Sequence, residues 1–170
     1  MTTRYRFLTE FELSSSPAAI EETLRDVTNW STWWRWARRI DPLTSEHGVV
    51  GARYRNRIAT PLLYGFTYDT EVVEVTDELI RLNVSGDLEG TGLFRFHPTT
   101  SGGSFLAFEW SVETCKQWMN LLAPLARPIF KWNHHRLMSD FGEGLGRASG
   151  GELIRTRHVS TPPPEAHSTR

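Results

Sequence analysis

The stretch that decides the fold is Gln117–Ala148, QWMNLLAPLARPIFKWNHHRLMSDFGEGLGRA, near the end of a chain of 170 residues. Its apolar residues recur at helical spacing and share one face of a helical wheel: Met119, Ala123, Ala126, Phe130, Leu137, Phe141 and Leu145. Pro124 and Pro128 mark a restart or kink early in this helix. A helix of about 24 residues from Pro124 is about 36 Å long, enough to cross an entire sheet. The sequence therefore predicts one long helix that covers a sheet.

The segments before this helix have the patterns of β-strands. Residues 5–13 alternate apolar and charged side chains with the two-residue period of a half-buried strand. Further strands, separated by turn residues, are predicted near residues 50–58, 64–75, 79–84, 88–97 and 105–114. Because the turns between them are short, these strands are expected to form an antiparallel meander with one face covered by the helix.

Two short helices are predicted after the first strand. Ser16 is a good N-cap and Pro17 suits the first position of the first helix. The second helix begins in residues 30–39, WSTWWRWARR, which hold four of the seven tryptophans. At about 100° per residue, its arginines lie on one face, and the other face carries Trp30, Trp33, Trp34 and Ala37. This segment is expected to pack against the sheet, either as plain core or as core that also forms the wall of a pocket. An interfacial anchor and a base-stacking platform are further alternatives.

Composition narrows the classes of partner. The chain has 19 basic and 20 acidic residues and a net charge of −1, so no overall field attracts nucleic acid or anionic lipid. The single cysteine, Cys115, cannot form an internal disulfide and fits a reducing compartment. The chain shows no signal-peptide pattern and no apolar run of about 18 residues. We expect a cytoplasmic protein with no nucleic-acid partner and no stable membrane insertion, and we leave the oligomeric state open.

The chain is expected to form one domain over residues 1–150. Beyond Gly150 and Gly151 the sequence becomes polar and ends in TPPPEAHSTR. This composition predicts a flexible tail over residues 151–170.

Four stretches together resemble a known group of proteins. They are FELSSSPAAIEETLRDVTNWSTWW (11–34), VSGDLEGTGLFRF (84–96), FEWSVET (108–114) and WMNLLAPLARPIFKWNHHRLM with GEGLGR (118–147). They resemble the polyketide cyclase/dehydrase and lipid-transport branch of the SRPBCC, or START-like, superfamily. The resemblance implies an α+β helix-grip fold: a curved antiparallel sheet of six to seven strands wrapped around the long C-terminal helix, enclosing a mainly hydrophobic cavity. A seventh strand would come from a split in 64–75 or from the 40–50 connection.

The polar pair Asn133 and His134 lies at the edges of the buried face of the long helix. His134 could act as a general base, because an imidazole titrates near neutral pH. Tyr68 is a second candidate for catalysis. Both helix residues could equally form hydrogen bonds inside the protein. The residues expected to contact a ligand are Trp33, Trp34, Tyr54, Asn56, Phe66, Tyr68, Phe94, Trp110, Phe130, Asn133, His134, Leu137 and Phe141.

The register of strand 50–58 decides the polarity of the pocket. If Tyr54 and Asn56 point inward, then Arg53, Arg55 and Arg57 point to solvent; a shift of one residue reverses this. We predict the first register, since the aromatic residues of strand 64–68 suit an apolar interior.

The sequence supports three functional hypotheses. The first is binding or carriage of a hydrophobic, lipid- or polyketide-like small molecule; the second is a cyclase or dehydratase that uses His134 and a pocket tyrosine; the third is a protein-interaction module that uses the tryptophan-rich helix. No histidine or cysteine shows metal-ligand spacing, and the glycines of residues 86–92 do not form a phosphate loop. We expect no metal and no cofactor.

Overall fold

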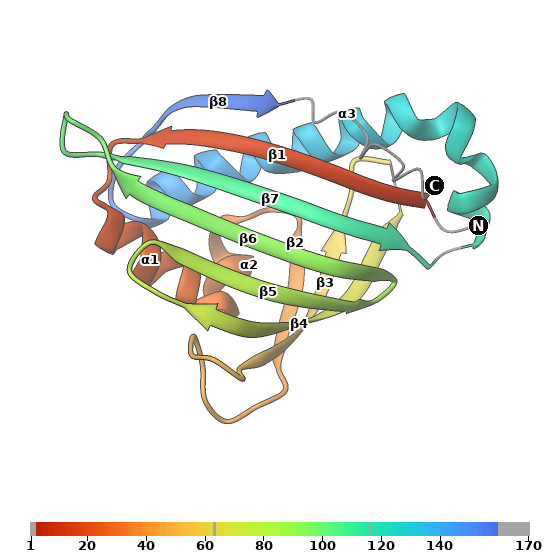
Figure 1. Ribbon diagram of the computed structural model, residues 1–170, viewed down its shortest axis with the longest axis horizontal. Coiled ribbons are helices and arrows are strands. Elements are labelled where there is room, and N and C mark those ends of the chain that lie inside the picture. The colour runs from red at the N-terminus through yellow and green to blue at the C-terminus, as the bar shows by residue number, and fades with distance from the viewer. Residues whose placement is uncertain (1–2, 63, 116, 160–170) are drawn as a thin grey trace, which may run out of the picture.

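The computed structural model describes residues 3–62, 64–115 and 117–159, with the backbone alone for residues 3 and 117–127. Eight strands form one antiparallel sheet in the order β2-β3-β4-β5-β6-β7-β1-β8 (Figure 1). The strands are β1 (Thr3–Leu13), β2 (Ala37–Pro42), β3 (Arg53–Ala59), β4 (Gly65–Val75), β5 (Leu79–Gly86), β6 (Leu88–Pro98), β7 (Ser104–Thr114) and β8 (Leu153–Val159). The helical elements are α1 (Pro17–Arg25), the 3-10 turn η1 (Val27–Asn29), α2 (Trp30–Trp33) and α3 (Gln117–Ala148).

Helix α3 lies behind the curved sheet and runs along it (Figure 1). Its bounds agree with the predicted helix. Phe130, Leu137, Phe141 and Leu145 are all buried, so the described part of the predicted apolar face is confirmed. The sheet and α3 together make the α+β, helix-grip architecture that the sequence predicted.

The first short helix forms as its sequence predicts. The Ser16 hydroxyl accepts a hydrogen bond from the amide of Ala19, and Pro17 occupies the first turn. Ile20 and Leu24 are buried. Helices α1 and α2 lie together at one end of the sheet (Figure 1), and this end is therefore covered by more than α3 alone.

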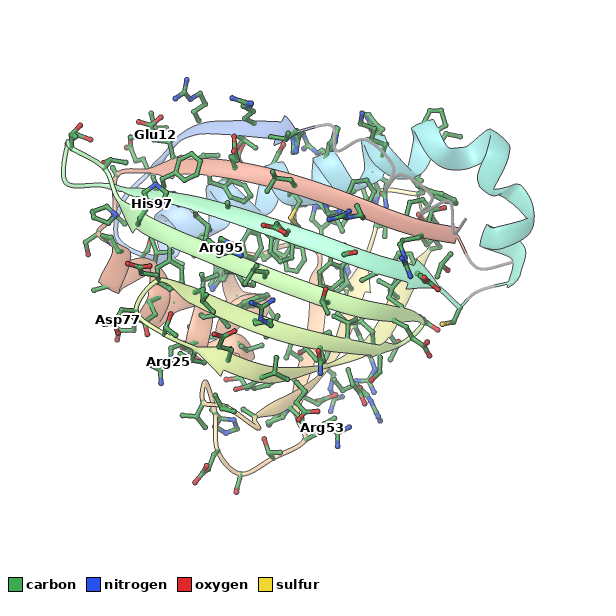
Figure 2. The ribbon with its side chains drawn as sticks, viewed as in Figure 1. Glu12, Arg25, Arg53, Asp77, Arg95 and His97 are labelled. Atoms are coloured by element: carbon green, nitrogen blue, oxygen red, sulfur yellow. The ribbon has the colours of Figure 1, made fainter. Side chains whose placement is uncertain are left out.

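Strand β3 adopts the predicted register. Tyr54 and Asn56 are buried, and the three arginines between and beside them are exposed. The labelled Arg53 points away from the sheet toward solvent (Figure 2). Arg55 pairs with Asp69 of β4 on this outer face, with Nε 2.8 Å from Oδ1. The arginines of β3 therefore lie on the face of the sheet opposite to its apolar interior.

The second short helix ends earlier than predicted. It stops at Trp33, Trp34 adopts an extended conformation, and Ala37 begins strand β2. The predicted helical face shared by the tryptophans and Ala37 is therefore wrong. Pairing with β3 explains the change: Ala37 lies opposite Ile58, and the amide of Ala59 donates to the carbonyl of Trp36 at 2.8 Å. Strand β2 is also an additional strand, and it overlaps the 40–50 connection considered for this role.

The polar tail does not begin at residue 151. Residues 153–159 form β8, which pairs with β1 from Leu8 to Leu13. The eighth strand exceeds the six to seven expected. Residues 160–170 of the predicted tail lie outside the described residues.

None of the described helices is both long enough and apolar enough to cross a bilayer.

Candidate functional site

A cavity of about 140 Å³ lies between the concave face of the sheet and α3, partly open to solvent. For scale, an apolar cavity of ~150 Å³ binds benzene. Its walls come from β1, β3 to β7, α1, α2 and α3, and are mainly aromatic and aliphatic. The cavity is therefore comparable in size to one that holds an aromatic ring.

Phe141 of α3 forms the centre of the aromatic wall at one end. Its ring lies 5.4 Å from that of Trp30 and 5.2 Å from that of Trp34, both in edge-to-face orientation. Phe94 and Phe108 stack on each other at 4.3 Å on the sheet side. Offset and edge-to-face ring contacts of this kind add to the stabilisation from burial. The wall is a packed set of rings that also presents apolar surface to the cavity.

Phe130 forms the opposite end of the same wall, about three helical turns earlier on α3. Its ring contacts those of Tyr5 and Tyr64 edge-to-face, at 5.9 and 6.3 Å. Both ends of the cavity are therefore aromatic.

Two polar residues of β3 in the cavity wall are satisfied by the protein. The hydroxyl of Tyr54 accepts a hydrogen bond from the amide of Gly48 at 2.7 Å. The Asn56 amide nitrogen donates to Thr70 Oγ1 at 3.0 Å. These bonds hold the inward face of β3 in place, and they give both residues a structural role.

The tyrosines of the cavity are strongly shifted away from ionisation. Burial raises the pKa of Tyr64 to about 12, with a smaller contribution from Tyr5. Burial also raises the pKa of Tyr68. Because desolvation penalises the phenolate, both groups remain neutral phenols at physiological pH.

His134 lines the cavity beside Asn133, as predicted, and its imidazole stacks on the ring of Phe7 at 3.9 Å. Burial lowers its pKa to about 3, and the neighbouring His135 and His158 add to this shift. The imidazole is therefore neutral at physiological pH. Its Nε2 atom is buried without a hydrogen-bond partner among the described residues.

His135, the next residue of α3, is half-buried against β8. Its ring stacks on that of His158 at 4.0 Å, and His158 Nδ1 lies 3.3 Å from Thr9 Oγ1.

Asn133 is buried and is held by a tyrosine. Its Nδ2 donates to the hydroxyl of Tyr64 at 3.3 Å. Its Oδ1 is buried with no hydrogen-bond partner in the described parts of the chain. The Nδ2 atom of this amide is thus hydrogen-bonded, and its Oδ1 atom has no hydrogen-bond partner among the described residues.

The structure brings twelve of the thirteen predicted ligand-contact residues to the cavity wall. They are Trp34, Tyr54, Asn56, Phe66, Tyr68, Phe94, Trp110, Phe130, Asn133, His134, Leu137 and Phe141. Trp33 is not among the lining residues; it packs on Phe141 at 5.3 Å and against Gly144. It faces a shallow groove between α1 and the end of α3.

The sequence reasoning omitted several lining residues from the set. Tyr5 and Phe7 come from β1, and Phe108 from β7. Each lies on the apolar side of an alternating strand, so the two-residue period could have identified them. Tyr64, just before β4, is a further lining residue outside the predicted set.

Charge is nearly excluded from the cavity. Arg25 is the one charged side chain among its described lining residues. Its guanidinium is already used, since Nε donates to the Gly48 carbonyl at 2.7 Å and Nη1 lies 3.3 Å from Glu21 Oε1. Within the described residues, no group of three or more His, Cys, Asp or Glu side chains is placed to hold a metal ion.

Comparison with known proteins gives a structural result. No protein-family profile matches the chain, and no curated protein matches it in sequence. A conserved protein from Geobacillus kaustophilus matches with a TM-score of 0.71 at 14% identity, over 92% of this chain and 100% of that one. The Zhui aromatase/cyclase from Streptomyces sp. R1128 matches with 0.70 at 12% identity, over 86% and 94%. Ara h 8.0201 matches with 0.60 at 12% identity, over 86% and 98%. The chain therefore has the helix-grip fold of SRPBCC-type proteins that its sequence resemblance implied.

Proposed function

We propose that this protein binds a neutral, apolar, ring-containing small molecule in the cavity between its sheet and α3. One observation carries the proposal: the cavity wall is built mainly of aromatic and aliphatic side chains, and the one charged residue among its described lining, Arg25, is already paired. Apolar walls with a few placed polar groups are typical of small-molecule sites. A charged ligand would lose its hydration without gaining a counter-ion.

The likeness to other helix-grip proteins is consistent with this proposal. One of the similar structures is described as an aromatase/cyclase. At 12% identity this likeness extends to the fold, and the choice of ligand rests on the cavity itself.

The cavity favours binding over acid–base catalysis. A general base works best with a pKa near the operating pH, whereas burial lowers the pKa of His134 to about 3. The Tyr68 phenol is shifted in the opposite sense, which makes it a poor proton donor. The pKa of His134 therefore lies far below the range that suits acid–base catalysis, and that of Tyr68 lies far above it.

The tryptophan-rich segment is used inside the protein. Trp33 packs on Phe141, and Trp36 Nε1 donates to Asp140 Oδ2 at 2.7 Å. Both side chains are half-buried. A protein-interaction role for this segment therefore lacks an exposed aromatic face.

Equilibrium dialysis with naphthalene tests the proposal. We expect saturable binding of one molecule per chain. Leu82 is half-buried in the cavity wall. Leu82→Trp should weaken naphthalene binding at least 10-fold, because the larger side chain occupies the space that the ligand needs.

Val50→Trp is the matched control, since Val50 is 60% exposed in the loop before β3. It adds the same side chain outside the cavity and should leave binding unchanged. Absence of binding to the unmodified protein, or equal binding by both variants, would contradict the proposal. A far-ultraviolet circular dichroism melt of each variant confirms that it is folded before dialysis.

A further inference from the structure

The inference starts from an unused hydrogen-bond acceptor in the cavity wall. Asn133 is 5% exposed and lines the cavity, and its Oδ1 is buried without a partner among the described residues. Buried polar groups of folded proteins are almost always hydrogen-bonded, and each exception asks for an explanation. Leaving a carboxamide oxygen unpaired costs free energy that a bound molecule could recover.

The other half of the same amide is already engaged. Nδ2 donates to the hydroxyl of Tyr64 at 3.3 Å, and Tyr64 is itself held by aromatic contacts to Phe66 and Phe130 at 5.4 and 6.3 Å. The amide is thus held at one side. A carboxamide oxygen accepts hydrogen bonds and never donates them, so a group that satisfies it must carry an O–H or N–H.

We propose that Asn133 is a specificity-determining residue, an inference that rests on the proposed function. The cavity selects neutral ring compounds that carry a hydrogen-bond donor, such as a phenolic hydroxyl. This group donates a hydrogen bond to Asn133 Oδ1. The ring system lies against the aromatic wall, and the hydroxyl reaches the Phe130 end of the cavity.

Two further atoms of lining residues are buried without partners in the described part of the chain, and they do not replace Asn133. Trp30 Nε1 is a donor only and lies at the Phe141 end of the cavity, where its ring contacts Phe94 and Phe141. His134 Nε2 adjoins Asn133 along α3, but its role depends on the tautomer of the imidazole. At the Phe130 end of the cavity, the Asn133 oxygen therefore calls for a ligand group that donates a hydrogen bond.

Charge supports the neutral character of the ligand. Arg25, the charged residue of the described lining, is engaged by Gly48 and Glu21. The rise in the pKa of Tyr64 shows that the surroundings of Asn133 disfavour an anion. A carboxylate in place of the hydroxyl therefore loses both the donor and its solvation.

Three neutral naphthalene compounds and one carboxylate test the inference on the unmodified protein. We expect 2-naphthol to bind roughly 5-fold more tightly than 2-methoxynaphthalene, which keeps the oxygen and loses the donor; one neutral hydrogen bond accounts for that ratio. Naphthalene should resemble the methoxy compound, and 2-naphthoate should bind more weakly than all three. Equilibrium dialysis gives each dissociation constant.

Asn133→Leu then assigns the preference to its residue. The variant should bring the ratio between 2-naphthol and 2-methoxynaphthalene to about 1 while naphthalene binding is retained or improved. Asn83→Leu, the same change on the exposed side of β5, is the matched control and should keep the full ratio.

The outcomes separate the two claims. Binding of naphthalene without a preference for 2-naphthol, or a preference that survives Asn133→Leu, overturns this inference and leaves the proposed function standing. Failure of all the neutral naphthalenes to bind contradicts the proposed function itself. The comparison on the unmodified protein decides the matter even if Asn133→Leu does not fold.

Discussion

The indole Nε1 of Trp34 donates a hydrogen bond to the main-chain carbonyl of Leu137 at 3.2 Å. The bond joins the segment after α2 to the middle of α3, 103 residues further along the chain. Trp34 is 4% exposed, and its ring meets Phe141 edge-to-face. The same side chain therefore closes the core and forms part of the cavity wall.

Trp34→Ala should lower the free energy of unfolding by about 3–5 kcal/mol, because it removes a large buried ring and leaves a space that the surrounding side chains cannot fill. Guanidinium unfolding followed by circular dichroism measures the change. Trp132→Ala is the matched control: Trp132 is 55% exposed on α3, and its loss should change stability by less than about 0.5 kcal/mol. A loss below about 1 kcal/mol for Trp34→Ala would show that the ring is not part of the core.

Gly144→Ala should destabilise the protein although alanine is the better helix former. A Cβ atom at position 144 would lie 2.5 Å from the carbonyl oxygen of Trp33, a backbone atom that cannot move aside alone. Overpacking costs about 1–3 kcal/mol and exceeds the gain of up to about 1 kcal/mol from helix propensity. Glu143→Ala, at the exposed neighbouring position, should have little effect. An equal or higher unfolding free energy for Gly144→Ala would contradict the close packing of α2 on α3.

The buried histidines should make the protein less stable in mild acid. Burial lowers the pKa of His134 to about 3 and that of His135 to about 4, both below the ordinary value of about 6.5, and burial lowers the pKa of His158 in the same direction. The unfolded chain therefore binds protons that the folded chain does not. The stabilisation is complete above about pH 6.5 and is lost as the pH falls from there toward about 4 and 3. Besides these three rings, the cation Lys131 acts on His135.

Calorimetric melting temperatures between pH 7.5 and pH 4.5 measure this dependence. His134→Phe keeps a ring that can stack on Phe7, and its melting temperature should fall less steeply over this range than that of the unmodified protein. Equal slopes for the two proteins, or an imidazole of His134 that titrates near 6.5 in an NMR experiment, would contradict burial of the neutral ring.

The elements with strong periodicity were predictable from the sequence. The apolar spacing on α3 gave its buried face, and alternation along β3 placed Tyr54 inward and its neighbouring arginines outward. The second helix was overestimated because the wheel of residues 30–37 looked amphipathic, while pairing of β2 with Ile58 and its neighbours favoured an extended chain. Tertiary pairing overrides a local pattern in such short segments.

Strand β8 was missed for a different reason. Four of its seven residues are polar or charged, and although Leu153 packs against the core, Ile154 is exposed, so the strand shows no apolar alternation. The strand forms because β1 offers it a free edge with unpaired backbone groups, and composition carries no signal of that kind. The same omission hid the stacking of His135 on His158.

The sequence predicted most residues of the cavity wall, but it did not predict the hydrogen bonds between them. Periodicity brought Asn133 and His134 to the cavity wall, yet the bond between Asn133 and Tyr64 joins positions 69 residues apart. It depends on where α3 crosses the start of β4. The resulting unpaired oxygen could only be recognised once that crossing was described.

The most direct test of the central claim is to locate a bound ring compound by NMR. Isotope-filtered nuclear Overhauser spectra of the labelled protein with unlabelled naphthalene report which side chains lie within about 5 Å of the ligand. The account predicts contacts to the ring protons of Phe108, Phe130 and Phe141, from the sheet and from both ends of the wall on α3. Contacts confined to exposed side chains such as Ile129 and Trp132, or none at saturating naphthalene, would contradict it.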